Sequence, residues 1–433
     1  MRALFLVAVI GAGLLATVRY PFAGVLLWTW FTCMQPHQEA YGFAQTAPLN
    51  FIIAGATVAA WIFSKERKVP PIDAMFVLIL AFLAWITFNG FFAVDPAWSW
   101  PLWQRTWKTV ALGLIIMVMA TNKVRVHALI WTVVVSLLYY GIKGGIFTIV
   151  TGGHNHVVGP PNSIIGDNNQ LAVALLMTLP LANYLRIHSA DRRLSIGLTA
   201  AMVLSTLSVL GSYSRGAFLA FLALAAAAWF RSKRKVLYLI TVVAVTVPLF
   251  YLMPQSYYDR LDTLQSTDTD SSFQGRILAW KVAFSYARDH FPFGNGFAGS
   301  ERPSVFNYYF PGEKTHAAHS IYFEVLGDNG FIGLAIYLAI LAVAFLNCRR
   351  IRRMARGSPE LAWVHDLVDM IQLSLFVFCV GGAALSLAYY DVFFIWAGLL
   401  SALLVQLRQA IPAKNAITVR ALPQSPAELA QTD

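Results

Sequence analysis

Long apolar runs alternate with short polar segments along almost the whole chain of 433 residues. Because the hydrocarbon core of a bilayer is about 30 Å thick, a helix needs about 20 mainly apolar residues to cross it. The pattern therefore predicts an all-α fold and a polytopic integral membrane protein. The expected spans lie near residues 47–63, 71–93, 107–120, 126–150, 165–187, 194–211, 215–230, 236–252, 320–346, 365–387 and 392–409.

The first 37 residues hold two further apolar pieces, separated by Arg19-Tyr20-Pro21. Each piece is short for a span, so we expect residues 1–37 to make one net crossing, which gives about 12 transmembrane helices with both chain ends in the cytoplasm. We interpret residues 1–433 as a single transmembrane domain that ends in a cytoplasmic tail, residues 411–433.

A polar stretch, residues 253–318, interrupts the apolar pattern and predicts one large loop. Within it, Ile277, Trp280 and Phe284 recur at helical spacing, which predicts a helix that packs on the membrane surface or on the spans. Long ordered loops commonly carry function, so residues where this loop meets the spans are candidates for handling a polar substrate.

Composition and charge support the membrane class and exclude a nucleic-acid-binding protein. The chain is 58% hydrophobic and 12% charged, whereas soluble domains carry about 25% charged residues. The net charge of +11 arises mostly from basic residues in short segments between spans, such as Lys123 and Arg125, as expected for cytoplasmic loops. The three cysteines form no CxxC pair, so we expect neither disulfides nor a metal site from Cys33, Cys348 and Cys379.

The alternation of the spans places several polar turns and the large loop on the outward side. One turn carries Arg215 between Ser214 and Gly216, where a guanidinium without access to water or an anion would be costly. Its planar fork of donors suits phosphate oxygens. An interfacial or structurally paired arginine explains the same position equally well. Arg276 lies in the first turns of the loop helix, where a cation opposes the helix dipole, so an anionic partner is plausible there.

Two histidines, His316 and His319, stand three residues apart before the span near residues 320–346. No HExxH motif or cysteine accompanies them, so we expect no metal site. His319 is predicted to begin the helix that carries Tyr322 and Glu324, where the positive end of the dipole would keep its imidazole neutral. A neutral imidazole can accept a proton as a general base.

Two other outward segments are candidates for substrate contact. Arg105 and Lys108 have a spacing that fits one helix face. Asn169 belongs to a run of polar side chains that opens a span, and capping of that helix and hydrogen bonding to sugar hydroxyls are equally good explanations of the run.

These motifs resemble those of the bacterial O-antigen ligase superfamily, which includes O-antigen polymerases and protein O-oligosaccharyltransferases. The resemblance covers roughly residues 160–410. It is carried by Ser212-Tyr213-Ser214-Arg215-Gly216, Arg276 with Trp280, Pro292-Phe293-Gly294-Asn295-Gly296-Phe297, and His319-Ser320 with Tyr322 and Glu324, followed by Gly327, Asn329, Gly330 and Gly333.

The resemblance implies an inner-membrane enzyme of the glycosyltransferase-C type with a periplasmic active site. Such an enzyme transfers a glycan from undecaprenyl diphosphate to a sugar hydroxyl of lipid A-core, with inversion and without a metal or other cofactor. Its partners are these two substrates and membrane lipids, with no nucleic acid. By this resemblance, His319 is the catalytic base, the donor diphosphate is held by Arg215, Arg276, Arg105 and Lys108, and the substrates are oriented by Tyr213, Ser214, Asn169, His316, Tyr322 and Glu324.

Other functions remain open from the sequence. Polymerisation and protein glycosylation use the same donor with another acceptor. The segment from Phe22 to His37 is also similar to proteins described as O-glycosylation ligases that accompany exosortase systems. In a different class, a transporter of lipid-linked glycans would use the same arginines to guide the diphosphate without chemistry. Paired inverted repeats would favour that function, and the sequence shows no clear repeat.

Overall fold

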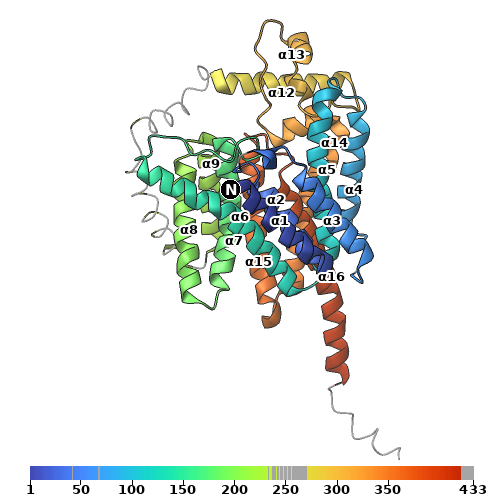
Figure 1. Ribbon diagram of the computed structural model, residues 1–433, viewed down its shortest axis with the longest axis vertical. Helices are drawn as coiled ribbons and strands as arrows, with labels where there is room; N and C mark the ends of the chain where they lie inside the picture. Colours follow the sequence, from blue (N-terminus) through green and yellow to red (C-terminus); the bar gives the residue numbers. More distant parts are fainter. Residues whose placement is uncertain are drawn as a thin grey trace, which may run out of the picture.

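The computed structural model describes residues 1–40, 42–66, 69–232, 234–236 and 271–420, together with residues 240, 243, 247, 251 and 255. Within these ranges the secondary structure is entirely helical (Figure 1). The main helices are α1 (Arg2–Arg19), α2 (Pro21–Met34), α3 (Leu49–Phe63), α4 (Ala74–Gly90), α5 (Pro96–Met119), α6 (Lys123–Val150), α7 (Asn168–Ile187), α8 (Arg192–Leu210), α9 (Arg215–Arg231), α12 (Ser271–Asp289), α14 (Ile321–Ala355), α15 (Ala362–Gly382) and α16 (Asp391–Arg420).

Seven helices among the described residues are long and apolar enough to cross a membrane. This confirms a polytopic helical membrane protein, whereas the count of about 12 spans and the glycosyltransferase-C architecture stay predictions. The expected span at residues 236–252 lies mostly outside the described residues. The seven helices are Arg2–Arg19, Lys123–Val150, Asn168–Ile187, Arg192–Leu210, Ile321–Ala355, Pro359–Gly382 and Asp391–Gln409.

Residues 1–37 fold as an antiparallel hairpin, so the single net crossing that we predicted is wrong. Gly13 of α1 packs against Leu27 of α2, and Thr17 packs against Gly24. The turn at the start of α2 lies on the side predicted to be cytoplasmic, because the Phe22 ring is 5.1 Å from the guanidinium of Arg125. The chain therefore enters and leaves this hairpin on the opposite side, which is the side predicted to be outward.

Residues 271–318 of the large loop lie at one end of the bundle, opposite the end from which α16 extends (Figure 1). They include α12 and two short helices, η3 (Gly299–Glu301) and α13 (Pro303–Tyr309). The predicted packing face of α12 is confirmed, since Trp280 stacks on Phe323 at 4.9 Å and Phe284 meets Phe331 edge-on at 5.9 Å. Residues 253–270 of the predicted loop, apart from residue 255, are outside the described residues.

The helix α14 is broken at Gly330, which has φ 67° and ψ −172°. This conformation is open essentially only to glycine. A break inside a buried helix leaves backbone groups without their helical partners, and these must be satisfied by other groups. Two side chains of α4 do so: Asn89 Nδ2 donates to the Asp328 carbonyl at 2.7 Å, and Trp85 Nε1 donates to the Asn329 carbonyl at 2.8 Å.

The glycine-rich segment at residues 292–297 pairs with the same break. The amide of Asn295 donates to the Gly327 carbonyl at 2.8 Å, and that of Gly296 donates to the Asp328 carbonyl at 3.0 Å. The amide of Gly294 donates to Asn89 Oδ1 at 2.9 Å, which closes the network. The role of this motif is therefore to hold the break in α14 and the residues around it.

We expect Gly330→Ala to lower the thermal stability of the purified protein strongly. The backbone conformation costs a residue with a Cβ about 1–3 kcal/mol, and the new Cβ would also clash with the Pro292 carbonyl. The matched control is Gly312→Ala, because Gly312 has φ 83° but open space around it. Unfolding temperatures in detergent measure both. Equal losses in the two variants would show that the pairing of the loop with α14 contributes nothing.

Candidate functional site

The turn between α8 and α9 presents Arg215 at the first helical position of α9. Ser214 caps this helix, because its Oγ accepts from the Ala217 amide at 3.1 Å. Tyr213 adopts a left-handed conformation with φ 57°, its hydroxyl donates to the Gly153 carbonyl, and its ring lies 4.5 Å from that of His156. The structure thus gives Ser214 and Tyr213 a structural function, which is to fix the turn that carries Arg215.

His319 lies just before α14, and the prediction that it begins this helix is wrong. Ser320 is the N-cap residue, and the helix starts at Ile321. His319 has φ 42°, a left-handed conformation that is uncommon for a residue other than glycine and is often found at functional sites. The preceding Ala318 carbonyl accepts a 2.6 Å hydrogen bond from Trp280 Nε1, so α12 fixes the position of this short segment.

The surroundings of His319 favour its neutral form. The side chain of His319 is exposed, yet the neighbouring protein removes part of its hydration. This loss of hydration and the positive charge of Arg276 lower the pKa of His319 below its usual value. Asp167 opposes the shift, while His316 adds to it. Both effects, lost hydration first and the charge of Arg276 second, favour the neutral form that a general base requires.

The helix α12 brings Arg276 and His316 to the same place. Gly275 leaves room for the His316 ring, since a Cβ on Gly275 would lie 2.6 Å from Nδ1. Three residues that the sequence proposed from separate segments, Arg276, His316 and His319, are thus gathered around one point of the outward end.

The start of α7 connects this group with the Arg215 turn. Asp167 caps α7 by accepting from the Asn169 amide at 2.9 Å, and the Asn169 side chain donates to the same oxygen at 2.7 Å. Asn168 Nδ2 donates to the Ser212 carbonyl at 2.6 Å. The polar run therefore caps the helix and holds the turn, and in this structure Asn169 hydrogen bonds to Asp167.

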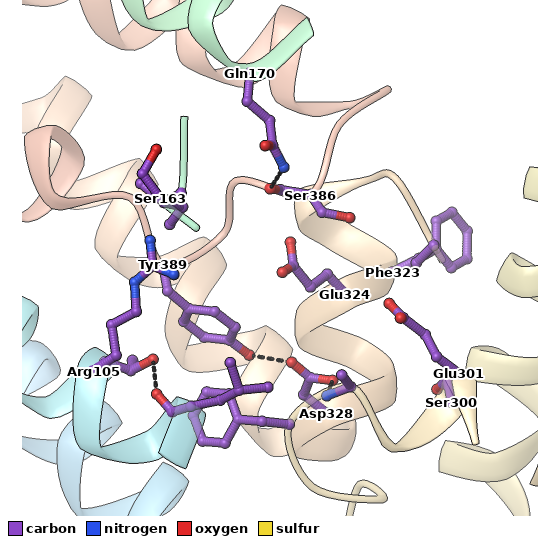
Figure 2. Close-up of a pocket in the computed structure, with 16 residues that line it drawn as sticks. Arg105, Ser163, Gln170, Ser300, Glu301, Phe323, Glu324, Asp328, Ser386 and Tyr389 are labelled. Carbon is purple, nitrogen blue, oxygen red and sulfur yellow. Dashed lines mark hydrogen bonds between the residues drawn. The ribbon is translucent and has the colours of Figure 1, made fainter. Parts of the chain in front are cut away.

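A cavity of about 240 Å³ has Ala318, the residue before His319, in its lining. Three carboxyl groups, from Glu301, Glu324 and Asp328, lie on one side of it, and Arg105 lies on the other (Figure 2). The full lining is Leu102, Arg105, Thr106, Ser163, Ile164, Gln170, Phe297, Ala298, Ser300, Glu301, Ala318, Phe323, Glu324, Asp328, Ser386 and Tyr389. We refer to it as the acidic cavity.

Hydrogen bonds from backbone amides and from a tyrosine hydroxyl fix the carboxyl groups of Glu324 and Asp328. Glu324 Oε2 accepts from the Ala388 amide at 3.1 Å. Asp328 accepts from the Ala298 amide at 2.9 Å and from the Tyr389 hydroxyl at 2.8 Å. Burial raises the pKa of Glu301. Sequence reasoning missed this residue, because only the packing of residues 292–301 against α14 brings it to the cavity. Such oxygens suit sugar hydroxyls.

Arg105 and Lys108 lie on one face of α5, as predicted, and both line a second cavity of about 680 Å³. Arg105 also lines the acidic cavity, so the two cavities share this side chain. Neither Arg215 nor Arg276 lines either cavity.

Tyr322 connects two helices and lines neither cavity. Its hydroxyl donates to the Cys379 carbonyl at 3.1 Å, which ties α14 to α15.

Over the part of the chain that the structure describes, no three or more His, Cys, Asp or Glu side chains are grouped as ligands for a metal ion.

Residues 200–338 match a family described as O-antigen ligase, which confirms the resemblance seen in the sequence. This region contains the turn with Arg215, the helix α12 and the segment with His319. Residues 1–190 match a family of unknown function. No curated protein matches the chain.

We expect two substitutions to move the pKa of His319 in opposite directions. Arg276→Gln removes a positive charge and raises it, whereas Asp167→Asn removes a negative charge and lowers it, while asparagine still caps α7. The measurement is the pH dependence of carbethoxylation at His319 by diethyl pyrocarbonate, followed by peptide mass spectrometry with His290 as the internal reference. Unchanged midpoints would show that neither charge acts on His319.

Proposed function

We propose that this protein transfers a glycan from undecaprenyl diphosphate to a sugar hydroxyl of lipid A-core, a reaction supported by the match of residues 200–338 to the O-antigen ligase family. The reaction takes place at the periplasmic face of the bacterial inner membrane. The observation that carries this proposal is His319, which is held by its neighbours in a left-handed conformation with a lowered pKa, beside Arg276.

In the proposed reaction His319 acts as the general base. Its neutral imidazole takes the proton of the acceptor hydroxyl as that oxygen bonds to the anomeric carbon of the donor sugar. The bond between the anomeric carbon and the diphosphate oxygen breaks in the same step, and undecaprenyl diphosphate leaves with the electron pair. Displacement from the opposite side inverts the configuration at the anomeric carbon.

Arginines offset the negative charge that develops on the leaving diphosphate. Arg276 belongs to the group around His319, and Arg215 sits on a turn that Asn168 ties to the start of α7. Guanidinium groups bind phosphate oxygens through paired hydrogen bonds, and fixed cations stabilise charge in a transition state without reorganisation. This is the task that a divalent metal ion performs in metal-dependent transferases.

The acidic cavity would receive the sugar next to the reacting hydroxyl. Its lining includes Ala318, the residue before His319, and Glu324 and Glu301 supply acceptors for sugar hydroxyls. The side chain of Gln170, which also lines the cavity, donates a hydrogen bond of 2.9 Å to the Ser386 carbonyl (Figure 2). Glu324 is therefore the best supported of the substrate-orienting residues.

We expect the purified protein, given carrier-linked glycan and lipid A-core, to form glycan-bearing lipid A-core. His319→Ala should reduce the rate by about 10²–10⁴-fold while donor binding persists, because general-base catalysis contributes about that much. Gel electrophoresis of the lipopolysaccharide product measures transfer. Wild-type activity of His319→Ala would eliminate His319 as the base.

Two further reactions, one with carrier-linked glycan alone and one with an added protein acceptor, distinguish the other enzymes. Lengthened glycan on the carrier in the first would indicate a polymerase, and a glycosylated protein in the second would indicate an oligosaccharyltransferase. Movement of carrier-linked glycan across proteoliposomes without any new glycosidic bond would indicate a transporter.

We expect Arg215→Lys to lower kcat/KM for carrier-linked glycan by at least about tenfold, since an ammonium keeps the charge but loses the paired hydrogen bonds. The matched control is Arg288→Lys, because Arg288 is exposed on α12 and pairs with Asp289 at 2.8 Å. Full activity of Arg215→Lys would instead support a purely interfacial arginine.

A further inference from the structure

The larger cavity lies between the segment that follows α2 and the outward part of α5. Its wall includes His37, Asn50, Arg105, Lys108 and Asp391. All of these except Asp391 belong to residues 1–190, so this cavity is built mainly by the part of the chain that lies outside the O-antigen ligase match. We call it the amino-terminal cavity.

Three side chains of this cavity carry buried polar atoms that hydrogen bond to no other group in the described part of the protein. They are Nη2 of Arg105, Nδ1 of His37 and Oδ1 of Asn50. Buried polar groups in proteins are nearly always paired, and exceptions gathered in one cavity indicate a binding site. Arg105, His37 and Asn50 bring a guanidinium, an imidazole and an amide to the wall of this cavity.

The charges of the amino-terminal cavity suit a ligand with a small negative charge. Arg105 and Lys108 are cations, and Asp391 is the opposing carboxyl group, which accepts hydrogen bonds from Thr109 and Thr32. Burial and the nearby Arg105 lower the pKa of His37 to about 4, so this ring is neutral at pH 7. The amino-terminal cavity thus presents two basic side chains and one carboxyl group, whereas the acidic cavity presents three carboxyl groups and one arginine.

The rest of the lining suits a sugar ring. Amide side chains donate to and accept from hydroxyl groups, and indole rings offer apolar faces with a polar edge. The His37 ring is held rigidly, because it stacks on Phe31 at 4.7 Å. The amides and indoles are Gln35, Gln38, Gln45, Asn50, Gln104, Asn162, Trp103 and Trp107.

We propose that the amino-terminal cavity binds a sugar unit that carries one acidic group, a carboxylate or a phosphate. Arg105 and Lys108 contact the acidic group, and His37, Asn50 and the glutamines contact the hydroxyls. Because Arg105 borders both cavities, the acidic unit lies near the sugar that occupies the acidic cavity. A diphosphate fits less well, since it carries more negative charge than the cavity offsets and has no ring to contact the indoles. That the bound unit belongs to a glycosyl substrate rests on the proposed function.

Calorimetric titration of the purified full-length protein tests this proposal with methyl glucuronide, glucose 6-phosphate, methyl glucoside and inorganic pyrophosphate. We expect the acidic sugars to bind at least about tenfold more tightly than methyl glucoside, as charged hydrogen bonds allow. Whichever of glucuronide and sugar phosphate binds more tightly identifies the acidic group. Equal binding of methyl glucoside and the acidic sugars would overturn the proposal, as would pyrophosphate binding as tightly as the preferred acidic sugar.

Variants locate the binding and separate it from catalysis. Arg105→Gln and Lys108→Gln should each remove the preference for acidic sugars, and Lys281→Gln, an exposed outward lysine of α12, should keep it. Lys108→Gln decides the result if Arg105→Gln does not fold. His319→Ala should bind acidic sugars as the wild type does while transfer is lost. Binding without any transfer by the wild type would refute the proposed function alone, and unchanged binding in Lys108→Gln would refute this inference alone.

Discussion

The arrangement of the outward end depends on the break in α14 at Gly330. A buried helix cannot stop without partners for its backbone groups, and here the partners come from α4 and from residues 292–297. Because Asn89 both donates to the Asp328 carbonyl and accepts from the Gly294 amide, one side chain joins three segments. This network sets the position of Asp328 and of the acidic cavity. It also helps to fix the first part of α14, which follows His319 in the chain.

The distribution of charge divides the outward end into regions with different tasks. Carboxyl groups gather in the acidic cavity, while the cations of α5 gather in the amino-terminal cavity, with Arg105 between them. Arg276 lines neither of these cavities, and its positive charge lowers the pKa of His319. A protein that only bound a diphosphate would not need three such environments. Their proximity fits an enzyme that holds an anionic leaving group, neutral hydroxyls and a charged sugar at once.

Local patterns predicted the parts of this structure that depend on neighbouring residues. The face of α12 with Trp280, the turn before Arg215 and the shared face of Arg105 and Lys108 all followed from spacing. The hairpin of α1 and α2 did not follow, because its direction is set by packing between the two helices. The break at Gly330 and the contribution of Glu301 depend on contacts between distant segments, which one sequence does not reveal. The exact start of α14, two residues after His319, was missed because Ser320 also satisfies the pattern of a first helical residue.

Hydrogen bonds join the two matched parts of the chain at the Arg215 turn and at the break in α14. Asn168 reaches across to the Ser212 carbonyl and so ties the Arg215 turn to α7, and Asn89 reaches across to the break in α14. Each of these amides belongs to residues 1–190 and each acceptor to residues 200–338. The amino-terminal half therefore does more than span the membrane. It fixes both the turn that carries Arg215 and the helix that follows His319.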